Sequence, residues 1–358
     1  MRTDKGRGPH YIKLSERNGS IMRSDLQKSS IISVHDITIP ILYEDGNMLA
    51  ICKPPHIPHH DDRQTGQLGI LSLIRELQQQ PNSTFPYPHR LYGVHRLDRV
   101  TSGILLFAKD SATANILVTK FRQREVVKYY FAVSGKRPKK KKQGWVKGRM
   151  VMGRRGSYKL LNGDKNLMKT NSEEEIDERI GQVESNDERG GYAMTRFYTA
   201  GLGNLELAHL PDTQYEDKDN STQYFTPKTA ILFEPHTGKT HQLRVAAKAV
   251  GLPILGDVRY GGGHAAPPSP ETIHSGEFSV WDRTYLHASA LHFQMNEGYN
   301  VTILSSPPFQ HLFVPTAKPV SINDNTQAKN DLTGIFVSMM KKYCDCVPIL
   351  NMMLQPLR

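Results

Sequence analysis

The chain has 358 residues, enough to bury a substantial core in one large domain or two smaller ones. Its formal net charge of +11 favours a polyanionic partner, with nucleic acid as the first candidate, although many basic proteins bind none. No apolar stretch reaches the roughly 18 residues that a membrane-spanning helix needs, and the N-terminus lacks the apolar core of a secretory signal, so we expect no membrane anchor.

The cysteine content indicates a reducing compartment. Cys52, Cys344 and Cys346 are the three cysteines, and they form neither a Cys-x-x-Cys pair nor a Cys/His cluster with zinc-site spacing. We therefore expect no metal site and an intracellular location, cytoplasmic or nuclear. The basic N-terminus leaves a mitochondrial presequence open as an alternative, and its acidic residues argue against one.

The first quarter of the chain is predicted to hold a leader, a hairpin and a helix. Residues 1–36 are polar and basic without clear periodicity, which predicts a flexible leader; the alternative is an ordered N-terminal arm. Residues 39–52 predict two strands around an Asp-Gly-Asn turn, and the Lys-Pro-Pro at 53–55 ends the second strand. Apolar residues at helical spacing predict a helix over 68–79, followed by a proline-rich loop.

A dense polar cluster stands directly before a buried strand. His95-Arg96-Leu97-Asp98-Arg99 leads through Thr101-Ser102-Gly103 into the apolar run 104–108, which predicts the strand. The pattern places a carboxylate between two guanidiniums on a loop that a rigid strand supports. Nearby positive charge keeps Asp98 ionised, which suits a nucleophile or an electrostatic stabiliser better than a general acid. A salt-bridged structural aspartate is the alternative.

A helix, a strand and a polar insertion follow. Ser111 is a candidate N-cap for a helix that continues to Phe121, and residues 126–133 predict a strand. Residues 134–191 are predicted to be an elaborated, disordered insertion. It opens with the basic run 136–142, for which a solvated loop, a nuclear address and a phosphate contact all stay open.

The second half contains three further strands and two helices. Strands are predicted at 193–198, 229–235 and 286–293, with a second polar insertion at about 210–226 and a helix that runs through Ala249. The tail, 316–358, contains a candidate amphipathic helix over 332–340, to which the sequence assigns no function.

Several of these stretches resemble, in order, the motifs of the RluA-type RNA pseudouridine synthases. Residues 95–109 resemble the family's signature, 128–130 its Lys-x-Tyr strand, and 237–244 its Thr-Gly-Arg-Thr-His-Gln-(Ile/Leu)-Arg motif. Residues 256–261 and 286–291 are similar to its Gly-Asp-x-x-Tyr-Gly loop and its closing Leu-His-Ala-x-x-Leu strand. The resemblance covers about residues 39–315. A protein-kinase catalytic loop is excluded because Leu97 interrupts the required His-Arg-Asp.

The chain departs from the family pattern at three positions. His56 stands where a glycine usually follows the Lys-Pro segment, and Ala246 stands where many relatives have histidine. Lys239 replaces the usual first arginine of the Thr-Gly motif, which keeps the charge and loses the planar fork.

The resemblance implies roles for individual residues. It makes Asp98 the nucleophile, Arg244 the cation that pairs with it, and Tyr130 the active-site aromatic that lies against the base. His95 is expected to support the motif, and Arg96 and Arg99 to fill the gap left by an extruded base, to grip phosphates or to form structural pairs. The candidate substrate-binding residues are therefore His95, Arg96, Arg99, Thr101, Lys239 and His241.

The implied fold is α+β, a mixed, largely antiparallel sheet with flanking helices, in one catalytic domain over 37–315. The implied activity converts uridine in tRNA or rRNA to pseudouridine; its atoms balance, so no cofactor is expected, and we expect a monomer. Whether Asp98 attacks C1′ or the base stays open. Two alternatives remain: an inactive RNA-binding protein of this fold, and a hydrolase that uses Asp98 or Ser102 with a histidine, although no Gly-x-Ser-x-Gly elbow occurs.

Overall fold

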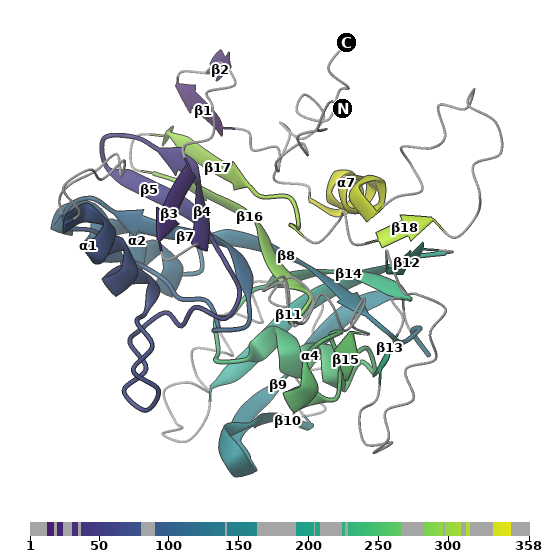
Figure 1. Ribbon diagram of the computed structural model, residues 1–358. Helices are drawn as coiled ribbons and strands as arrows, with labels where there is room; N and C mark the ends of the chain where they lie inside the picture. Colours follow the sequence, from purple (N-terminus) through teal and green to yellow (C-terminus); the bar gives the residue numbers. More distant parts are fainter. Residues whose placement is uncertain are drawn as a thin grey trace, which may run out of the picture. The chain divides into compact units, whose positions relative to one another are not determined.

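The structure is a computed structural model. It describes residues 13–17, 20–23, 31–34, 37–79, 90–139, 142–162, 191–203, 205–207, 224–225, 228–265, 283–295, 298–308, 313–315 and 332–344. Contacts divide the chain into two compact units (Figure 1). Unit 1 comprises residues 1–126, 287–310 and 346–358, and unit 2 comprises residues 127–286 and 311–345.

Unit 1 is built on a mixed sheet with the strand order β3–β4–β5–β7–β16–β17–β1–β2, in which only β7 and β16 are parallel. The short β6 pairs with the end of β7. The strands are β1 (Lys13–Arg17), β2 (Ser20–Arg23), β3 (Ile31–Val34), β4 (Ile37–Glu44), β5 (Met48–Lys53), β6 (Tyr92–Gly93), β7 (Ser102–Ala108), β16 (Leu286–Gln294) and β17 (Asn300–Leu304). The helices are α1 (Ile70–Gln79) and α2 (Ser111–Arg122).

The predicted strand after the polar cluster is confirmed as β7. All seven of its residues are buried, and it lies between β5 and β16 in the sheet. A strand with neighbours on both sides and both faces covered must be apolar along its whole length, which explains the uninterrupted run. β7 is therefore the rigid support on which the Asp98 loop ends.

The predicted hairpin over 39–52 is confirmed as β4 and β5. Asp45 fixes its turn, because one carboxylate oxygen accepts hydrogen bonds from the backbone N–H groups of Asn47 and Met48 at 2.8 and 2.7 Å. The helices predicted over 68–79 and after residue 110 are also confirmed. The N-cap of α2 is Asp110 rather than Ser111, since the Asp110 carboxylate accepts from the N–H of Thr113.

Unit 2 is built on an antiparallel sheet with the order β10–β9–β11–β14–β8. The strands are β8 (Val127–Ser134), β9 (Gln143–Met152), β10 (Tyr158–Asn162), β11 (Tyr192–Gly201), β12 (Leu205–Leu207), β13 (Tyr224–Phe225), β14 (Thr229–Pro235), β15 (His264–Ala265) and β18 (Phe313–Pro315). The helices are α4 (Gln242–Ala249) and α7 (Leu332–Tyr343), with 3-10 turns η1 (Arg154–Gly156) and η2 (Val258–Tyr260). The predicted strands at 126–133, 193–198 and 229–235 and both predicted helices are thus confirmed.

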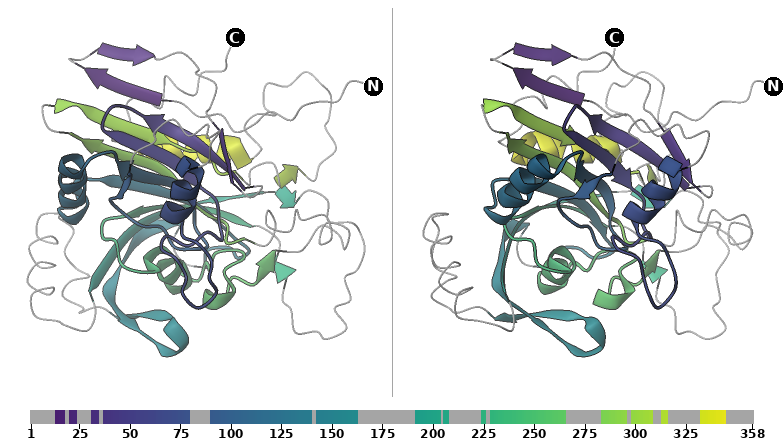
Figure 2. Two further views of the ribbon diagram at one scale, coloured as in Figure 1. Left: turned by 60° about the vertical axis from the view of Figure 1, so that its left-hand side comes forward. Right: turned by 90° about the vertical axis from the view of Figure 1, so that its left-hand side faces the viewer.

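Helices α4 and α7 cover opposite faces of the unit 2 sheet (Figures 1 and 2). Tyr198 on β11 stacks on α7, so the even-numbered side chains of β11 face α7. Thr195 accepts a hydrogen bond from Gln242 of α4, so the odd-numbered ones face α4. The register Phe197–Phe233–Tyr130 across β11, β14 and β8 then places Tyr130 on the α4 face.

Several expectations about the leader and the insertions need correction. β1, β2 and β3 lie within residues 1–36, which corresponds to an ordered arm over these strands. β9 and β10 lie within the predicted insertion 134–191, and β9 is hydrogen-bonded on both sides. β13 lies at the end of the insertion 210–226. β9 was missed because a strand whose polar residues alternate with apolar ones resembles solvated chain. Residues 163–190 and 208–223 lie outside the described residues.

The architecture confirms the predicted α+β class, a mixed and mostly antiparallel sheet arrangement with a few helices. The single catalytic domain expected over 37–315 is distributed over both units. Among the described residues, no helix is long and apolar enough to cross a membrane.

Gly251 and Gly256 provide a matched test of how closely the chain packs at the end of α4. Both have left-handed φ, +77° and +78°, but a Cβ at Gly251 would meet nothing within 4 Å, whereas one at Gly256 would lie 1.8 Å from the carbonyl oxygen of Arg283. We expect Gly251→Ala to lower the free energy of unfolding by about 1 kcal/mol, from φ alone. Gly256→Ala should cost about 3 kcal/mol, because backbone must also move. Urea unfolding midpoints measure both; equal midpoints would contradict the packing argument.

Candidate active site

Asp98 lies in a tight turn immediately before β7. Its carbonyl oxygen accepts a hydrogen bond from the N–H of Thr101 at 3.0 Å, which closes the turn. Asp98 is half-buried, whereas Thr101 and Ser102 are buried. The carboxylate is therefore carried by a constrained backbone and keeps access to a ligand.

Lys53, a buried lysine that the sequence analysis did not select, stabilises this turn. Lys53 is fully buried, and its Nζ donates to the carbonyl oxygens of Pro54, Ile57 and Arg99 at 2.8, 2.9 and 3.3 Å. An ammonium has three N–H donors, so these three carbonyls match its capacity. The Lys-Pro stretch at the end of β5 was a signal that could have identified Lys53.

The two arginines beside Asp98 differ in how they are held. Arg99 donates from Nε to the carbonyl oxygen of His56 at 3.2 Å and lies 3.7 Å from a carboxylate oxygen of Asp62. Arg96 is exposed and has no hydrogen-bond or ion-pair partner within the described part of the chain. Arg99 is therefore engaged in structural pairing, and Arg96 is the better placed of the two to contact a ligand.

His95 is built into the protein. Its Nε2 accepts a hydrogen bond from the N–H of Leu106 at 2.9 Å, and its ring stacks on Phe121 of α2 with centroids 4.6 Å apart. These contacts join α2, β7 and the polar cluster. They favour the supporting role that the sequence analysis expects for His95.

Behind the turn, a buried polar chain fixes Ser102. His287 is fully buried and bonds Ser102 Oγ through Nδ1 and Ser305 Oγ through Nε2, both at 2.9 Å. Ser305 donates onward to Cys52 Sγ at 3.7 Å. The second nitrogen of the histidine thus bonds a hydroxyl rather than a carboxylate, and Ser102 is 1% exposed. A Ser-His-Asp hydrolase centred on Ser102 is contradicted, because it needs an accessible serine and a carboxylate.

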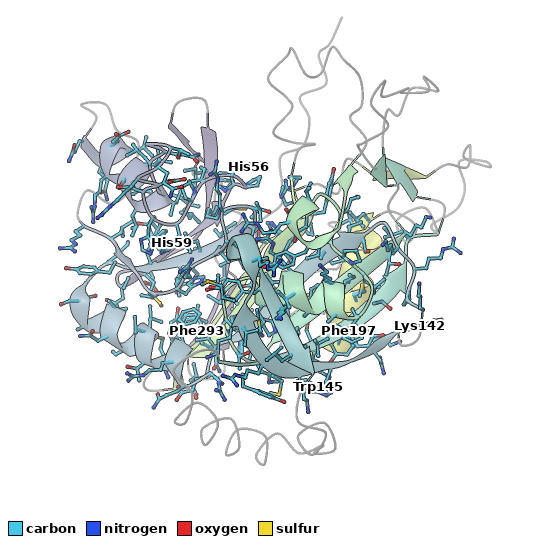
Figure 3. All side chains as sticks on the ribbon, turned by 90° about the horizontal axis from the view of Figure 1, so that it is seen from below. His56, His59, Lys142, Trp145, Phe197 and Phe293 are labelled. Atoms are coloured by element: carbon cyan, nitrogen blue, oxygen red, sulfur yellow. The ribbon has the colours of Figure 1, made fainter. Side chains whose placement is uncertain are left out.

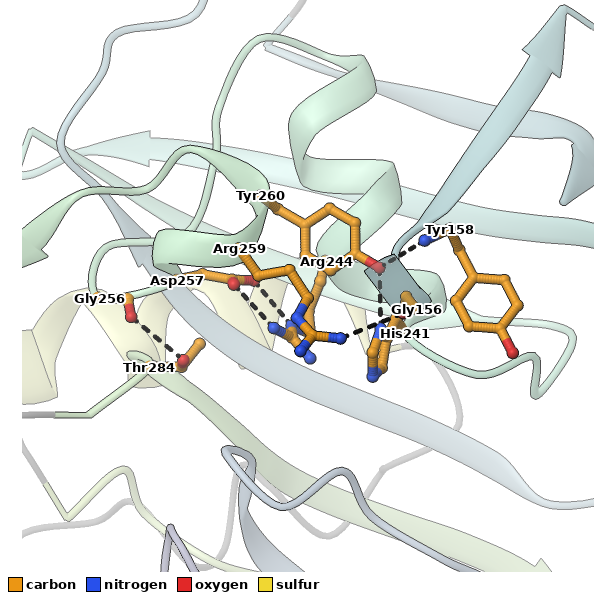
Figure 4. Close-up of polar contacts among 9 residues, drawn as sticks. All are labelled: Gly156, Tyr158, His241, Arg244, Gly256, Asp257, Arg259, Tyr260 and Thr284. Carbon is orange, nitrogen blue, oxygen red and sulfur yellow. Dashed lines mark hydrogen bonds and ion pairs between the residues drawn. The ribbon is translucent and has the colours of Figure 1, made fainter. Parts of the chain in front are cut away.

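In unit 2, Arg244 is held in a fixed orientation. Its Nε and Nη2 each donate to one carboxylate oxygen of Asp257 at 2.8 Å, and its Cζ lies 4.9 Å from the ring centre of Tyr260 (Figure 4). Both Arg244 and Asp257 are buried. A bidentate pair of this kind constrains the guanidinium in plane and direction, which a lysine could not reproduce.

Tyr260 links this pair to His241. Its hydroxyl accepts from the N–H of Tyr158 at 2.9 Å and bonds His241 Nδ1 at 2.8 Å (Figure 4). Burial raises the pKa of Tyr260, so the phenol stays protonated. His241 itself has left-handed φ of 59° at the start of α4. His241 is therefore positioned by the same network that holds Arg244.

Gln242 anchors the start of α4. Its Oε1 accepts from Thr237 Oγ1 and from the N–H of Lys239, and its Nε2 donates to the carbonyl oxygen of Met194 and to Thr195 Oγ1, at 2.7 to 3.0 Å. All four capacities of the amide are used. Lys239 lies directly over Gly191, where a Cβ would be 2.3 Å from its Nζ.

The structure thus gathers the predicted residues into two sets. Asp98, His95, Arg96, Arg99 and Thr101 lie together around the turn before β7 in unit 1. Arg244, His241 and Lys239 lie together at the start of α4 in unit 2, and Tyr130, which is half-buried, lies on the sheet face that α4 covers. Among the described residues, no group of three histidine, cysteine or acidic side chains could hold a metal ion.

A sequence model of the family described as RNA pseudouridylate synthase matches residues 47–249. The chain belongs to this family. An uncharacterized RNA pseudouridine synthase of Haemophilus influenzae is 31% identical over 270 residues, 75% of this chain and 88% of that protein. The tRNA pseudouridine synthase C of Pasteurella multocida is 30% identical over 72% of this chain and 86% of that protein. The ribosomal large subunit pseudouridine synthase C of Vibrio parahaemolyticus is 30% identical over 71% of this chain and 61% of that protein.

The geometry explains one departure from the pseudouridine synthase pattern. His56, at the position where glycine is usual, has a φ of +67°. This left-handed conformation favours glycine, and a residue with a Cβ pays about 1 kcal/mol to adopt it. The backbone at His56 therefore adopts the turn that glycine would make, and the carbonyl oxygen of His56 accepts a hydrogen bond from Arg99.

His59 in the same loop is a titratable group that sequence reasoning did not select (Figure 3). It is 8% exposed, and its Nδ1 is buried without a hydrogen-bond partner among the described residues. Burial, reinforced by the charges of His60, Arg96 and Lys53, lowers the pKa of His59 to about 4. This imidazole is therefore neutral at physiological pH.

The first prediction from the site concerns the buried pair. We expect Asp257→Asn to lower the free energy of unfolding by about 3 kcal/mol, because buried Arg244 loses the charge of the carboxylate that binds it through two hydrogen bonds. The exposed pair between Lys120 and Glu125, also at 2.8 Å, is the control, and Glu125→Gln should cost within about 1 kcal/mol. Urea unfolding followed by tryptophan fluorescence measures both. Similar losses in the two variants would show that burial does not govern the pair.

The second concerns pH. The folded pKa of His59, about 4, lies below its usual 6.5, so the unfolded chain binds the extra proton and stability falls as pH drops from 6.5 towards 4. The expected loss from this group is about 3 kcal/mol. His59→Gln should remove that part of the acid sensitivity, whereas the control His60→Gln, in an exposed neighbour, should retain it. Thermal midpoints between pH 4 and pH 7.5 test this, and parallel curves for wild type and His59→Gln would overturn it.

Proposed function

We propose that this chain converts specific uridines in structured RNA to pseudouridine, with Asp98 as the nucleophile. The observation that carries the proposal is the family match over residues 47–249, a segment that includes Asp98, Tyr130 and Arg244. The half-buried carboxylate in a constrained turn supports it, because a nucleophile must be both accessible and held. The names of relatives indicate tRNA or rRNA as the substrate class.

The reaction is an isomerisation whose atoms balance. The N1–C1′ bond of uridine breaks, the uracil rotates, and a C5–C1′ bond forms; the C5 proton leaves and N1 gains a proton. Asp98 supplies the electron pair that stabilises the intermediate, by attack on C1′ or on the base. A conventional glycosidase would place a second carboxylate across the bond.

We propose that Arg244 keeps Asp98 ionised and aligned. Asp257 fixes the plane of its guanidinium through Nε and Nη2, and a guanidinium has five N–H donors, enough to serve two carboxylates. A charge-assisted pair with Arg244 would favour the ionised form of the nucleophile. Tyr130 is proposed to lie against the uracil and to assist removal of the C5 proton.

The target base must leave its stack to reach these groups. Unstacking costs a few kcal/mol and costs least where the base is already unpaired, so we expect a uridine in a loop or bulge. Arg96, exposed beside Asp98, is the residue that we propose contacts the neighbouring phosphates or fills the vacated position. His241 and Lys239 are proposed to contact the substrate from the start of α4.

Tritium release from RNA labelled at uridine C5 tests the proposal. Wild type should release tritium from tRNA or rRNA, and Asp98→Asn should reduce the rate by at least about 100-fold, because the amide is not a nucleophile. Asp110→Asn is the matched control, since asparagine caps a helix as well as aspartate does, and it should retain full activity. Arg244→Lys should lower the rate, because lysine cannot span Asp257 and a second carboxylate in one plane.

Two outcomes would count against this assignment. Release that survives Asp98→Asn would exclude Asp98 as the nucleophile. RNA binding by wild type without release from any RNA pool would instead favour an inactive RNA-binding protein of the same fold.

A further inference from the structure

The face of unit 2 that carries α7 has a continuous stack of cations and aromatic rings. Arg196 Cζ lies 5.5 Å from the ring centre of Trp145 and 5.2 Å from that of Tyr198. The Tyr198 ring stacks on Tyr343 of α7 with centroids 4.1 Å apart and an interplanar angle of 18°. Lys147, at 4.9 Å, contacts the Trp145 ring as well. Tyr198 and Lys147 are buried, and Trp145, Arg196 and Tyr343 are half-buried, so this stack fixes the end of α7 against the sheet.

Helix α7 lies across the strands of the sheet. Phe131, Leu232 and Tyr198 form one row over β8, β14 and β11. Phe336 of α7 contacts Phe131, with ring centroids 5.3 Å apart, and Tyr343 contacts Tyr198. Seven residues of helix rise about 10 Å, which matches the width of two strand spacings. The last turn of α7 therefore lies over β11, and it carries the exposed α7 lysines, Lys341 and Lys342.

The described ends of the basic run, residues 136–139 and Lys142, are named here the basic rim, and they reach the same place. They lie between β8 and β9, which are not neighbours in the sheet, because β14 and β11 separate them. The carbonyl oxygen of Lys136 accepts from Thr229 Oγ1 at 2.7 Å. The carbonyl oxygen of Lys142 accepts from the N–H and Oγ1 of Thr199 at 2.8 and 2.7 Å. The described ends of the rim are thus hydrogen-bonded to the sheet, and Lys136, Lys139 and Lys142 are exposed.

The register joins the rim to α7. Gln143, the residue after Lys142, lies directly opposite Tyr198 on the neighbouring strand. Tyr198 is the residue on which Tyr343 stacks, and Lys342 Nζ lies 5.1 Å from the Tyr343 ring centre. The backbone at Lys142 and the last turn of α7 therefore both lie at the end of β11 (Figure 3 labels Lys142 and Trp145).

Simpler roles account for part of this arrangement. Lysines in a last helical turn complement the helix dipole, and exposed basic runs are commonly only solvated. Neither role requires the rim to be tied to two strands or the helix end to be stacked on Tyr198. The acidic residue that the register places beside Arg196 is Glu234, and it contacts His236 at 3.4 Å.

We infer that the basic rim and the α7 lysines form a second RNA-binding surface, which holds the phosphate backbone of RNA away from the target uridine. The inference rests on the proposed function for the identity of the polyanion. The surface lies on the sheet face opposite Tyr130 and α4, so it contributes affinity and leaves the chemistry to other residues. Phosphate contacts of this kind are independent of base sequence and weaken with salt.

The test uses the full chain and measures affinity separately from catalysis. The rim variant replaces four exposed lysines with glutamine: Lys139, Lys142, Lys341 and Lys342. The control variant removes the same charge from four exposed cations elsewhere: Arg75, Arg122, Lys159 and Lys248. Affinity for labelled polyuridylate of about 40 nucleotides is measured by fluorescence anisotropy between about 50 and 200 mM salt. Tritium release at saturating RNA is measured in parallel, and circular dichroism verifies folding.

We expect the rim variant to bind polyuridylate at least about tenfold more weakly than wild type, with a salt slope smaller by about 2 to 3, while tritium release at saturating RNA is unchanged. The control variant should lose much less affinity for polyuridylate. Equal losses in the two variants, or an unchanged slope in the rim variant, would overturn the inference and leave the proposed function standing. A wild type that binds no RNA would overturn both, and a wild type that binds without release would overturn the proposed function alone.

Discussion

The buried pair between Arg244 and Asp257 is the interaction on which the organisation of unit 2 depends. Taking both charges out of water is costly, and the cost is offset because two parallel hydrogen bonds satisfy them together. Asp257 can reach Arg244 only because Gly256 lets the chain pass against the backbone of Arg283. The Tyr260 ring covers the guanidinium, and the Tyr260 hydroxyl is hydrogen-bonded to His241 and holds it in place. One electrostatic requirement thus dictates a glycine, an aromatic ring and a histidine orientation.

The local sequence pattern was enough to predict the elements that have a continuous apolar run or an apolar face. An unbroken apolar run predicts β7, and apolar residues at helical spacing predict α1, because each of these elements buries a whole face. β9 was not predicted, because its polar and apolar residues alternate. Its apolar positions, such as Val146 and Met150, alternate with the charged Lys147 and Arg149, so one face resembles a solvated one, although Lys147 is buried and the strand is paired on both sides.

The candidate site was predictable as a set of residues and only partly as a set of contacts. Asp98, Tyr130 and Arg244 stand in motifs that a single sequence displays, and the family match includes all three. The partners that hold them could not be predicted, because each bond is made across the fold. Ser102 meets His287 across 185 residues, and Lys53 meets the carbonyl of Arg99 across 46. Short motifs identify the residues that carry the chemistry, whereas contacts with residues far away in the sequence fix the positions of those residues.

The parallel pairing of β7 with β16 has a consequence for biosynthesis. The ribosome completes β7 about 180 residues before it makes the strand that covers its other edge, since Ser102 and its partner His287 are 185 positions apart. At about 5 to 20 residues per second, that interval lasts on the order of 10 to 40 seconds. During this time the edge of β7 at Ser102 and Gly103, which β16 later covers, presents unpaired backbone groups. The nascent chain should therefore depend on chaperones most while residues 127–286 are being translated.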